Sequence, residues 1–213
     1  MNKKLDVQVP VTRSYSAEYR AEGNKITGLA AVYGSTTPIG NWFYEVIDRG
    51  AFDEADLTDV LFFINHQTEK IPLARSRRNN GSSTMILNII DRGLEMDADV
   101  DTENNSEARA LHSSISRGDI TGMSFMFRVK DEEWENLDSD MPTRRITKIA
   151  KVWEVSAVNY PAYQSTDINA REEARSLESD LKALENARAA LDKAKEEKEV
   201  LKLKNLIISK RGW

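Results

Sequence analysis

The sequence predicts an α+β protein in which a strand-rich domain is followed by a long helix. Between residues 14 and 158, short runs of alternating apolar and polar residues recur, with turn-forming residues between them. From Ala170 to Ile208 there is no glycine or proline, and Ala, Leu, Glu and Lys dominate, which is typical of a helix. We therefore expect a flexible arm over residues 1–12, a domain over residues 13–168 and a helical tail over residues 169–213.

The composition indicates a globular protein. Its 213 residues can bury a full core, and 31% charged and 40% hydrophobic residues are typical of a folded domain. With a net charge of -5, nothing suggests nucleic acid as the main partner. There is no cysteine, which excludes disulfides and thiol nucleophiles and fits the cytosol. We expect no signal peptide and no membrane span, because no apolar run approaches the roughly 18 residues that a span requires.

The strands are expected to form hairpins where glycine-containing turns join them, at Glu22-Gly23-Asn24 and Asp91-Arg92-Gly93. Residues 60–64 form a continuous apolar run of buried-strand length, a pattern that a helix can share. The expected strands, in chain order, cover residues 14–19, 25–33, 42–47, 57–64, 84–90, 94–100, 122–129 and 145–158.

The expected helices are few. Residues 48–52 are expected to start a short helix, and residues 105–117 show helical spacing that ends naturally at Gly118. Residues 131–142 are acidic and are expected to be a mobile insert. In the tail, leucines recur every seven residues, but charged residues soon interrupt this seam, at Arg188, Lys195 and Lys198. We expect the tail to be solvated, weakly self-associating or docked on a partner.

Ser124 lies in the segment with the clearest strand pattern. Met123, Phe125, Phe127 and Val129 share one face, and Ser124 points to the other, just after Gly122. A serine so placed can be a nucleophile if a base lies beside it. Taken alone, this segment favours a structural serine.

The candidates for a base and its partner are few. His66 ends the most apolar strand candidate, and histidine is the usual general base for a serine, although a structural histidine at a strand end is the commoner case. Glu154 falls among residues that should be buried, so it needs a donor, which His66 or Arg128 could supply. His112 is interpreted as a surface residue of the short helix.

A metal or phosphate site is poorly supported. An acidic cluster lacks the glycine and terminal glutamate of a calcium loop, and no glycine-rich phosphate loop is present; the cluster consists of Asp97, Asp99, Asp101 and Glu103. We expect no cofactor.

Several motifs, in their order along the chain, resemble the prohead (capsid maturation) proteases of tailed phages. The resemblance runs from about Ile26 to Ala170, and the ordered set is far more specific than any one motif. The motifs are Gly28-Leu29-Ala30-Ala31-Val32-Tyr33, Tyr44-Glu45-Val46-Ile47-Asp48-Arg49-Gly50-Ala51-Phe52, Asn65-His66, Asp91-Arg92-Gly93-Leu94, Gly122-Met123-Ser124-Phe125-Met126-Phe127 and Glu154-Val155-Ser156-Ala157-Val158 with Pro161-Ala162-Tyr163.

The resemblance implies a fold similar to that of herpesvirus assembly proteases, a mainly antiparallel β-barrel surrounded by short helices. It implies Ser124 as nucleophile, His66 as general base and Glu154 as the group that orients His66. The herpesvirus relatives use a second histidine in that third role, but this chain has no histidine after Ser124. It also departs from the family at Leu73-Ala74-Arg75, where Leu-Gly is common.

The implied function is that of a serine endopeptidase that needs no cofactor. It would cleave the scaffolding segment of the capsid precursor, scaffold proteins and itself through an acyl-enzyme, inside the procapsid in the host cytoplasm. The tail would recruit the enzyme to capsid or scaffold helices and be removed by autolysis, and self-association into a dimer is possible, as in the herpesvirus relatives. The alternative is a catalytically inactive internal scaffold protein of the same fold, acting through its helical tail.

Overall fold

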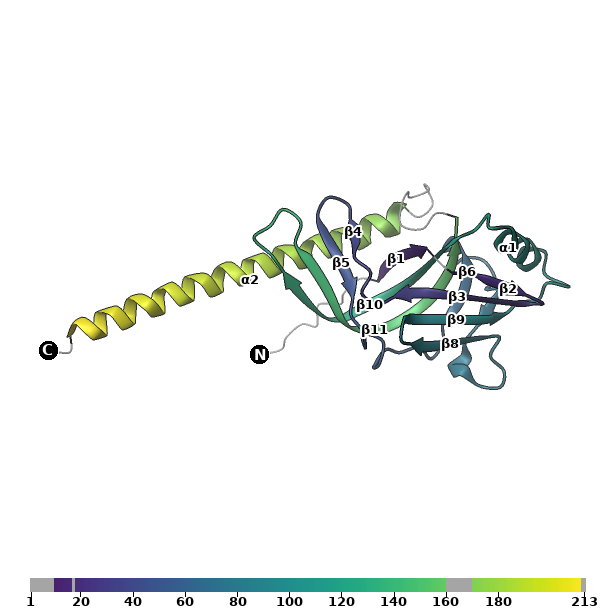
Figure 1. Cartoon of the computed structure of the whole chain (residues 1–213), viewed down its shortest axis with the longest axis horizontal. Coiled ribbons are helices and arrows are strands. Elements are labelled where there is room, and N and C mark those ends of the chain that lie inside the picture. The colour runs from purple at the N-terminus through teal and green to yellow at the C-terminus, as the bar shows by residue number, and fades with distance from the viewer. Residues whose placement is uncertain (1–9, 17, 160–169, 212–213) are drawn as a thin grey trace.

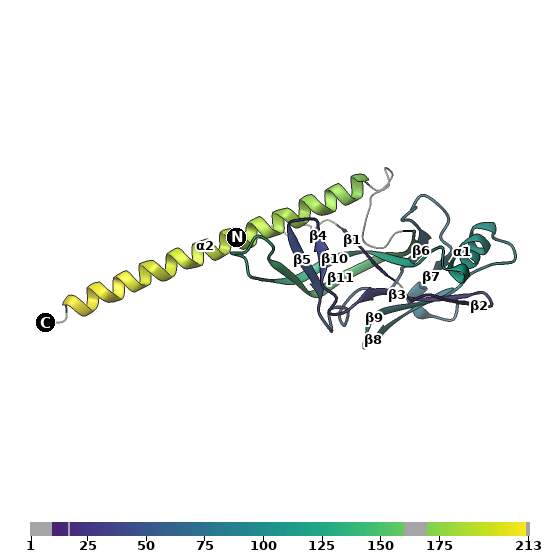
Figure 2. The same ribbon diagram turned by 45° about the horizontal axis from the view of Figure 1, so that its top comes forward.

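The computed structural model describes residues 10–16, 18–159 and 170–211. These form two β-sheets, a short helix and a long helix that extends away from the sheets (Figures 1 and 2). The predicted α+β class, with mostly sheet and a C-terminal helix, is confirmed. The helices are α1 (Ser106–Arg117) and α2 (Ala170–Arg211), and the strands are β1 (Val11–Ser16), β2 (Arg20–Glu22), β3 (Lys25–Val32), β4 (Thr37–Ile39), β5 (Phe43–Ile47), β6 (Leu61–Ile64), β7 (Ala74–Arg75), β8 (Met85–Ile90), β9 (Gly93–Asp99), β10 (Gly122–Glu135) and β11 (Thr143–Val158).

The larger sheet is built around the hairpin of β10 and β11. Its strand order is β1-β10-β11-β5-β4, and β6 pairs with β11 and with β7. Since β11 is 16 residues long, it accommodates two parallel partners along its length. It pairs with β5 over residues 143–146 and with β6 over residues 154–157. The end of β6 therefore lies beside the last residues of β11.

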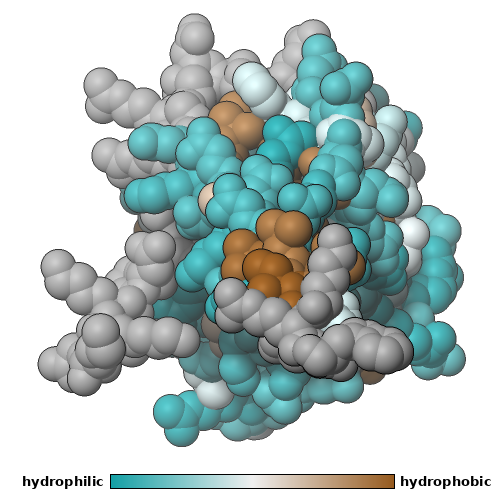
Figure 3. Space-filling view, turned by 90° about the vertical axis from the view of Figure 1, so that its left-hand side faces the viewer, coloured by the Kyte–Doolittle hydropathy of each residue, from teal (hydrophilic) through white to brown (hydrophobic). Residues whose placement is uncertain are grey.

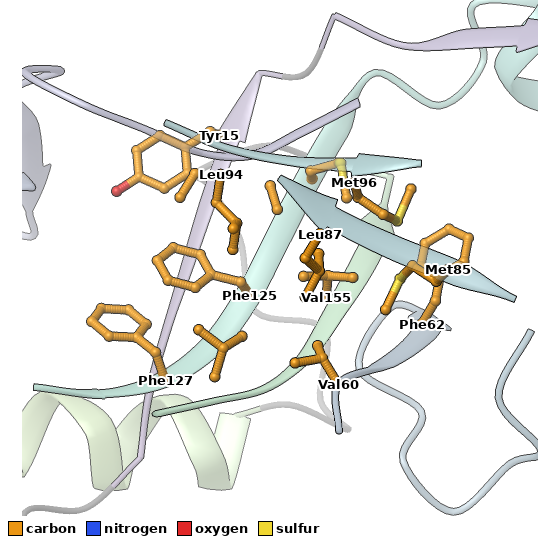
Figure 4. Packing of buried hydrophobic residues seen from close by; sticks show 14 of the residues in the cluster. Tyr15, Val60, Phe62, Met85, Leu87, Leu94, Met96, Phe125, Phe127 and Val155 are labelled. Atoms are coloured by element: carbon orange, nitrogen blue, oxygen red, sulfur yellow. The ribbon is translucent and has the colours of Figure 1, made fainter. Parts of the chain in front are cut away.

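The smaller sheet, β2-β3-β9-β8, covers the apolar face of the larger one. Figure 4 shows side chains of β8 and β9, such as Leu87 and Met96, lying against Phe125 and Val155 of the larger sheet. The rings of Phe125 and Phe127 stack with centroids 4.3 Å apart. The alternation predicted for residues 122–129 is thus confirmed, because these apolar side chains are buried in the core.

The barrel implied by the resemblance is not found, since neither sheet closes among the described residues. β3 bonds to β9 and faces β10 across the core, so it does not join the edge of the larger sheet. The edges of the larger sheet are β1, β4 and, on the branch through β6, β7; those of the smaller sheet are β2 and β8. Two packed sheets, with mostly antiparallel pairing, replace the expected barrel.

Two local expectations were wrong. Residues 48–55 form successive hydrogen-bonded turns and no helix, as in the bonds from Ala51 N to Asp48 O and from Asp53 N to Gly50 O, both 3.0 Å. The predicted acidic insert is strand in its first part, because β10 continues to Glu135, and only residues 136–142 form the turn before β11 begins at Thr143. Trp134 fixes this extension by packing edge-on against Phe43, with centroids 5.2 Å apart.

The short helix α1 forms where the sequence predicts it. The side chain of Asn105 accepts hydrogen bonds from Glu107 N and Ala108 N, which satisfies two of the free N–H groups at its start. Gly118 takes a left-handed φ of 78° and ends the helix.

The long helix α2 packs on the domain at its start and is exposed at its end. Ser176, Asp180 and Leu184 are buried, whereas five apolar side chains near its end are at least half exposed. Figure 3 views this end and shows apolar atoms gathered there; the five side chains are Val200, Leu201, Leu203, Leu206 and Ile207. No helix of the described ranges is both long and apolar enough to cross a bilayer.

Two of the three charged residues that interrupt the leucine seam contact the β10–β11 hairpin. Arg188 donates to the backbone oxygens of Leu137 and Ser139, and Lys195 pairs with Asp138 at 2.7 Å. A leucine at either position would lose a contact with the turn that the helix passes.

Candidate active site

The structure brings Ser124, His66 and Glu154 into one hydrogen-bonded row. Nε2 of His66 lies 2.7 Å from Oγ of Ser124, and Nδ1 of His66 lies 2.5 Å from Oε1 of Glu154. The three side chains come from positions up to 88 residues apart. All three are nearly inaccessible, with Ser124 at 0%, Glu154 at 2% and the His66 side chain at 7% exposure.

The sheet register explains why Ser124 and Glu154 are neighbours. Ser124 lies opposite Ser156, and Met126 lies opposite Glu154, so the four residues share one face of the β10–β11 pair. This is the face away from Phe125, which lies in the core. The Glu154 side chain therefore lies on the polar face of the sheet, on the same side as Ser124, and the apolar face is left for core packing.

His66 reaches this face through a turn with unusual backbone angles. Beyond the end of β6, Asn65 and His66 have φ values of 48° and 55°. Left-handed angles are costly for residues other than glycine and are found where a side chain must be held in a particular place. The turn is tied to β11 by the bond from Asn65 N to Ala157 O, at 2.9 Å, and it directs the imidazole back over the sheet.

The buried carboxylate of Glu154 is satisfied on both oxygens. His66 contacts Oε1, and the hydroxyl of Ser156 donates to Oε2 at 2.6 Å. Arg128, the other candidate partner, instead places its guanidinium over the ring of Trp153, 5.8 Å from the centroid. A buried carboxylate without donors would be strongly unfavourable, so these two contacts explain how Glu154 is tolerated there.

Two further groups at the site were not among the predicted site residues. Ser156 donates to Glu154 and accepts the backbone N–H of His66 at 3.2 Å. Ser156 is two positions after Glu154 on a strand, and residues at this spacing lie on the same face of a sheet. The sequence therefore indicated that the two side chains are neighbours. The backbone oxygen of Arg13 accepts the hydroxyl of Ser124 at 2.9 Å. No sequence pattern reports a backbone oxygen.

The arrangement has the parts needed for nucleophilic chemistry. An imidazole in contact with a hydroxyl can take its proton, and a carboxylate on the far ring nitrogen can hold the ring and stabilise the cation that forms.

The remaining candidates lie outside this row. His112 is half-buried on α1, and its buried Nε2 has no hydrogen-bond partner within the described chain. The acidic residues near the β9 end are engaged by other side chains: Asp97 by Lys25, Asp99 by Asn24 and Asp101 by Asn104. In the ranges that the structure covers, no three metal-ligating side chains come together.

Comparison with known proteins yields one informative match. A family model described as the caudovirus prohead serine protease matches residues 12–181, most of the chain. No curated protein and no solved structure matches significantly.

Proposed function

This chain belongs to the caudovirus prohead serine protease family, and on that premise we propose that Ser124, His66 and Glu154 form a catalytic triad. The family supports a capsid maturation protease that acts within the procapsid and interacts with capsid precursor proteins. The observation that carries the residue assignment is the contact of Ser124 Oγ with His66 Nε2, together with that of His66 Nδ1 with Glu154.

In the proposed reaction, the hydroxyl hydrogen of Ser124 first rotates from the Arg13 oxygen to Nε2 of His66. His66 then takes this proton as Oγ attacks a peptide carbonyl carbon. Glu154 holds the ring and balances the charge of the imidazolium. The imidazolium then gives its proton to the leaving amine, which departs as the acyl-enzyme forms. His66 next takes a proton from water, the hydroxide attacks the ester, and Ser124 regains its hydrogen.

A peptide cannot reach Ser124 in the conformation described, because the residue is fully buried. The groups around the hydroxyl must therefore part before acylation. In this proposal, the burial of Ser124 restrains the reaction until a substrate is presented.

The proposed substrates are the scaffolding segment of the capsid precursor, scaffold proteins and the protease itself. We retain as parts of this proposal the domain over residues 13–168 and the tail over residues 169–213, with the tail recruiting the enzyme, self-associating and being removed by autolysis. The kinship with herpesvirus assembly proteases is likewise proposed. It is supported by a serine and a histidine reached from strands of one sheet, with Glu154 replacing the second histidine.

An inactive internal scaffold of the same fold is the second candidate. Such a protein would need the core residues and α2 but not a buried row of serine, histidine and carboxylate. We favour the enzyme because burying three polar side chains in mutual contact has a cost that a scaffold would have no reason to retain.

The experiment that tests the proposal is co-expression with the capsid precursor, followed by intact mass measurement. The wild type is compared with Ser124→Ala and with Ser113→Ala, an exposed serine of α1. We expect the wild type and Ser113→Ala to trim the precursor and Ser124→Ala to leave it intact. Equal trimming by all three would assign the cleavage to host proteases, and assembled but uncleaved particles in every sample would favour the scaffold.

A further inference from the structure

Two buried residues of α2, Ser176 and Asp180, are linked to the nucleophile through one residue, Arg13. Its backbone oxygen accepts the hydroxyl of Ser124, while its side chain extends to α2 and to β5. Arg13 is only 7% exposed. It lies in β1, an edge strand of six residues that pairs with β10 alone among the described strands.

All five N–H groups of the Arg13 guanidinium have acceptors. Nε and Nη2 donate to the two oxygens of Glu45, at 2.5 and 2.8 Å, and Nη2 also donates to Oδ2 of Asp180 at 2.7 Å. Nη1 donates to the backbone oxygen of Thr12 at 2.9 Å and approaches Oγ of Ser176 at 3.4 Å. A planar fork with every donor used fixes its own position closely.

Asp180 bridges two buried arginines. Its other oxygen, Oδ1, accepts from Nη1 of Arg144 at 2.7 Å, and Arg144 also contacts Glu45 and Glu132. Burial alone would lower the pKa of the Arg13 guanidinium, but the charges of Glu45 and Asp180 outweigh it and raise that pKa above its usual value. The Arg13 guanidinium therefore stays charged, and in this buried cluster it depends on the neighbouring carboxylates for compensation.

We propose that Asp180 and Arg13 are positioning residues for Ser124, so that the first turns of α2 form part of the support of the active site. Asp180 and Glu45 hold the Arg13 side chain, and the side chain holds β1 in register on β10. The Arg13 oxygen on β1 in turn keeps the Ser124 oxygen in place, 2.7 Å from His66 Nε2. This proposal rests on the proposed function. The family match starts one residue before Arg13 and ends one residue after Asp180, so it includes both partners.

This positioning role restricts the autolytic removal proposed above for residues 169–213 to the part of the tail beyond Leu184. A cut before Ser176 would take Asp180 away and leave two buried arginines undercompensated, whereas a cut after Leu184 would keep the whole cluster. We expect the mature active enzyme to retain α2 through Leu184.

The test uses Asp180→Asn in the full chain, with Glu178→Gln as the matched control, because Glu178 is exposed on the same turn. Two quantities are measured per folded molecule: the labelling rate of Ser124 by a fluorophosphonate, and kcat and KM on a peptide that spans a mapped cleavage junction. We expect Asp180→Asn to lower kcat and labelling by roughly 10- to 100-fold with KM changed less than about twofold, as for a small displacement of a nucleophile. Glu178→Gln should match the wild type.

A purely structural role gives a different result. Asp180→Asn would then lower Tm and the folded yield, but kcat and labelling per folded molecule would stay at wild-type values, and the proposal would be overturned. If Asp180→Asn does not fold, Arg13→Lys takes its place, since it keeps the charge and the backbone oxygen but loses the fork. Unchanged kcat and labelling in folded Arg13→Lys would equally overturn it.

The same measurements distinguish a protein that is not a protease from a protease in which Asp180 has no positioning role. If the protein is not a protease, the wild type neither cleaves the precursor nor reacts with the fluorophosphonate at Ser124. If only the positioning role is wrong, the wild type cleaves the precursor and is labelled, and Asp180→Asn does so at the same rates.

Discussion

Ser156 donates a hydrogen bond of 2.6 Å to Oε2 of Glu154, and its oxygen accepts the backbone N–H of His66. One buried hydroxyl therefore holds both the carboxylate and the turn that carries the imidazole. Because the turn has left-handed backbone angles, it depends on such contacts to persist.

We expect Ser156→Ala to lower kcat by roughly 10- to 100-fold with little change in KM, since the carboxylate and the ring lose a shared anchor. The measurement is steady-state cleavage of a junction peptide, with Ser113→Ala as the exposed-serine control. Ser156→Thr, which keeps the hydroxyl, should recover part of the rate. A wild-type kcat in Ser156→Ala would show that Glu154 and His66 are held without it.

Glu154→Gln should be far more damaging than its small change in shape suggests. The amide cannot compensate an imidazolium and can turn its NH₂ group toward His66, so kcat should fall by roughly 1,000- to 10,000-fold. Glu133→Gln, on the exposed part of β10, is the matched control. Cleavage rates and Tm are measured together; a fully active Glu154→Gln would refute its role beside His66.

Arg144 is expected to matter mainly for stability. It is 3% exposed and contacts three carboxylates, so Arg144→Met leaves Asp180 and Glu45 with Arg13 alone. Removing one member of a buried ionic network costs about 3–5 kcal/mol. The free energy of unfolding is measured in urea, with the exposed Arg117→Met as the control, for which a change below about 1 kcal/mol is expected. A small loss in Arg144→Met would mean that the remaining charges compensate one another.

Asp56 should make a small, pH-dependent contribution to stability. Hydrogen bonds from Lys151 and from the hydroxyl and N–H of Thr58 hold the pKa of its carboxyl below the usual range. The stabilisation is therefore present above the unfolded pKa of about 3.9 and is lost as the pH falls through the lower folded value. Because the side chain is 41% exposed, it amounts to less than about 1 kcal/mol.

The measurement compares Tm of the wild type and Asp56→Asn at neutral pH and near pH 3. The wild type should be slightly more stable at neutral pH, and the difference should shrink in acid. Asp140→Asn, on the exposed β10–β11 turn, should show no such convergence. A constant difference at both pH values would mean that the charge of Asp56 is not responsible.

Much of the local structure follows from the sequence because it depends on neighbours within an element. The alternation around Ser124 separates its hydroxyl from the core face, and the Asn105 and Gly118 caps delimit α1. The same reasoning failed for residues 131–142, where an acidic composition concealed strands stabilised by Trp134 on Phe43 and by the pairing of Arg144 with Glu132. Those partners come from elsewhere in the chain.

Periodicity, capping residues and composition were enough to predict which side chains face away from the core and where α1 and α2 form. The motifs were enough to make Ser124, His66 and Glu154 candidates for one site. Packing of the elements selects His66 and not Arg128 as the partner of Glu154. It also brings Arg13 to Asp180, which lies 167 residues after it, and so connects Asp180 to Ser124. Periodicity orients a side chain only within its own strand or helix. Its partner is selected by sheet register and by the need to compensate buried charges, which arise only when the elements pack.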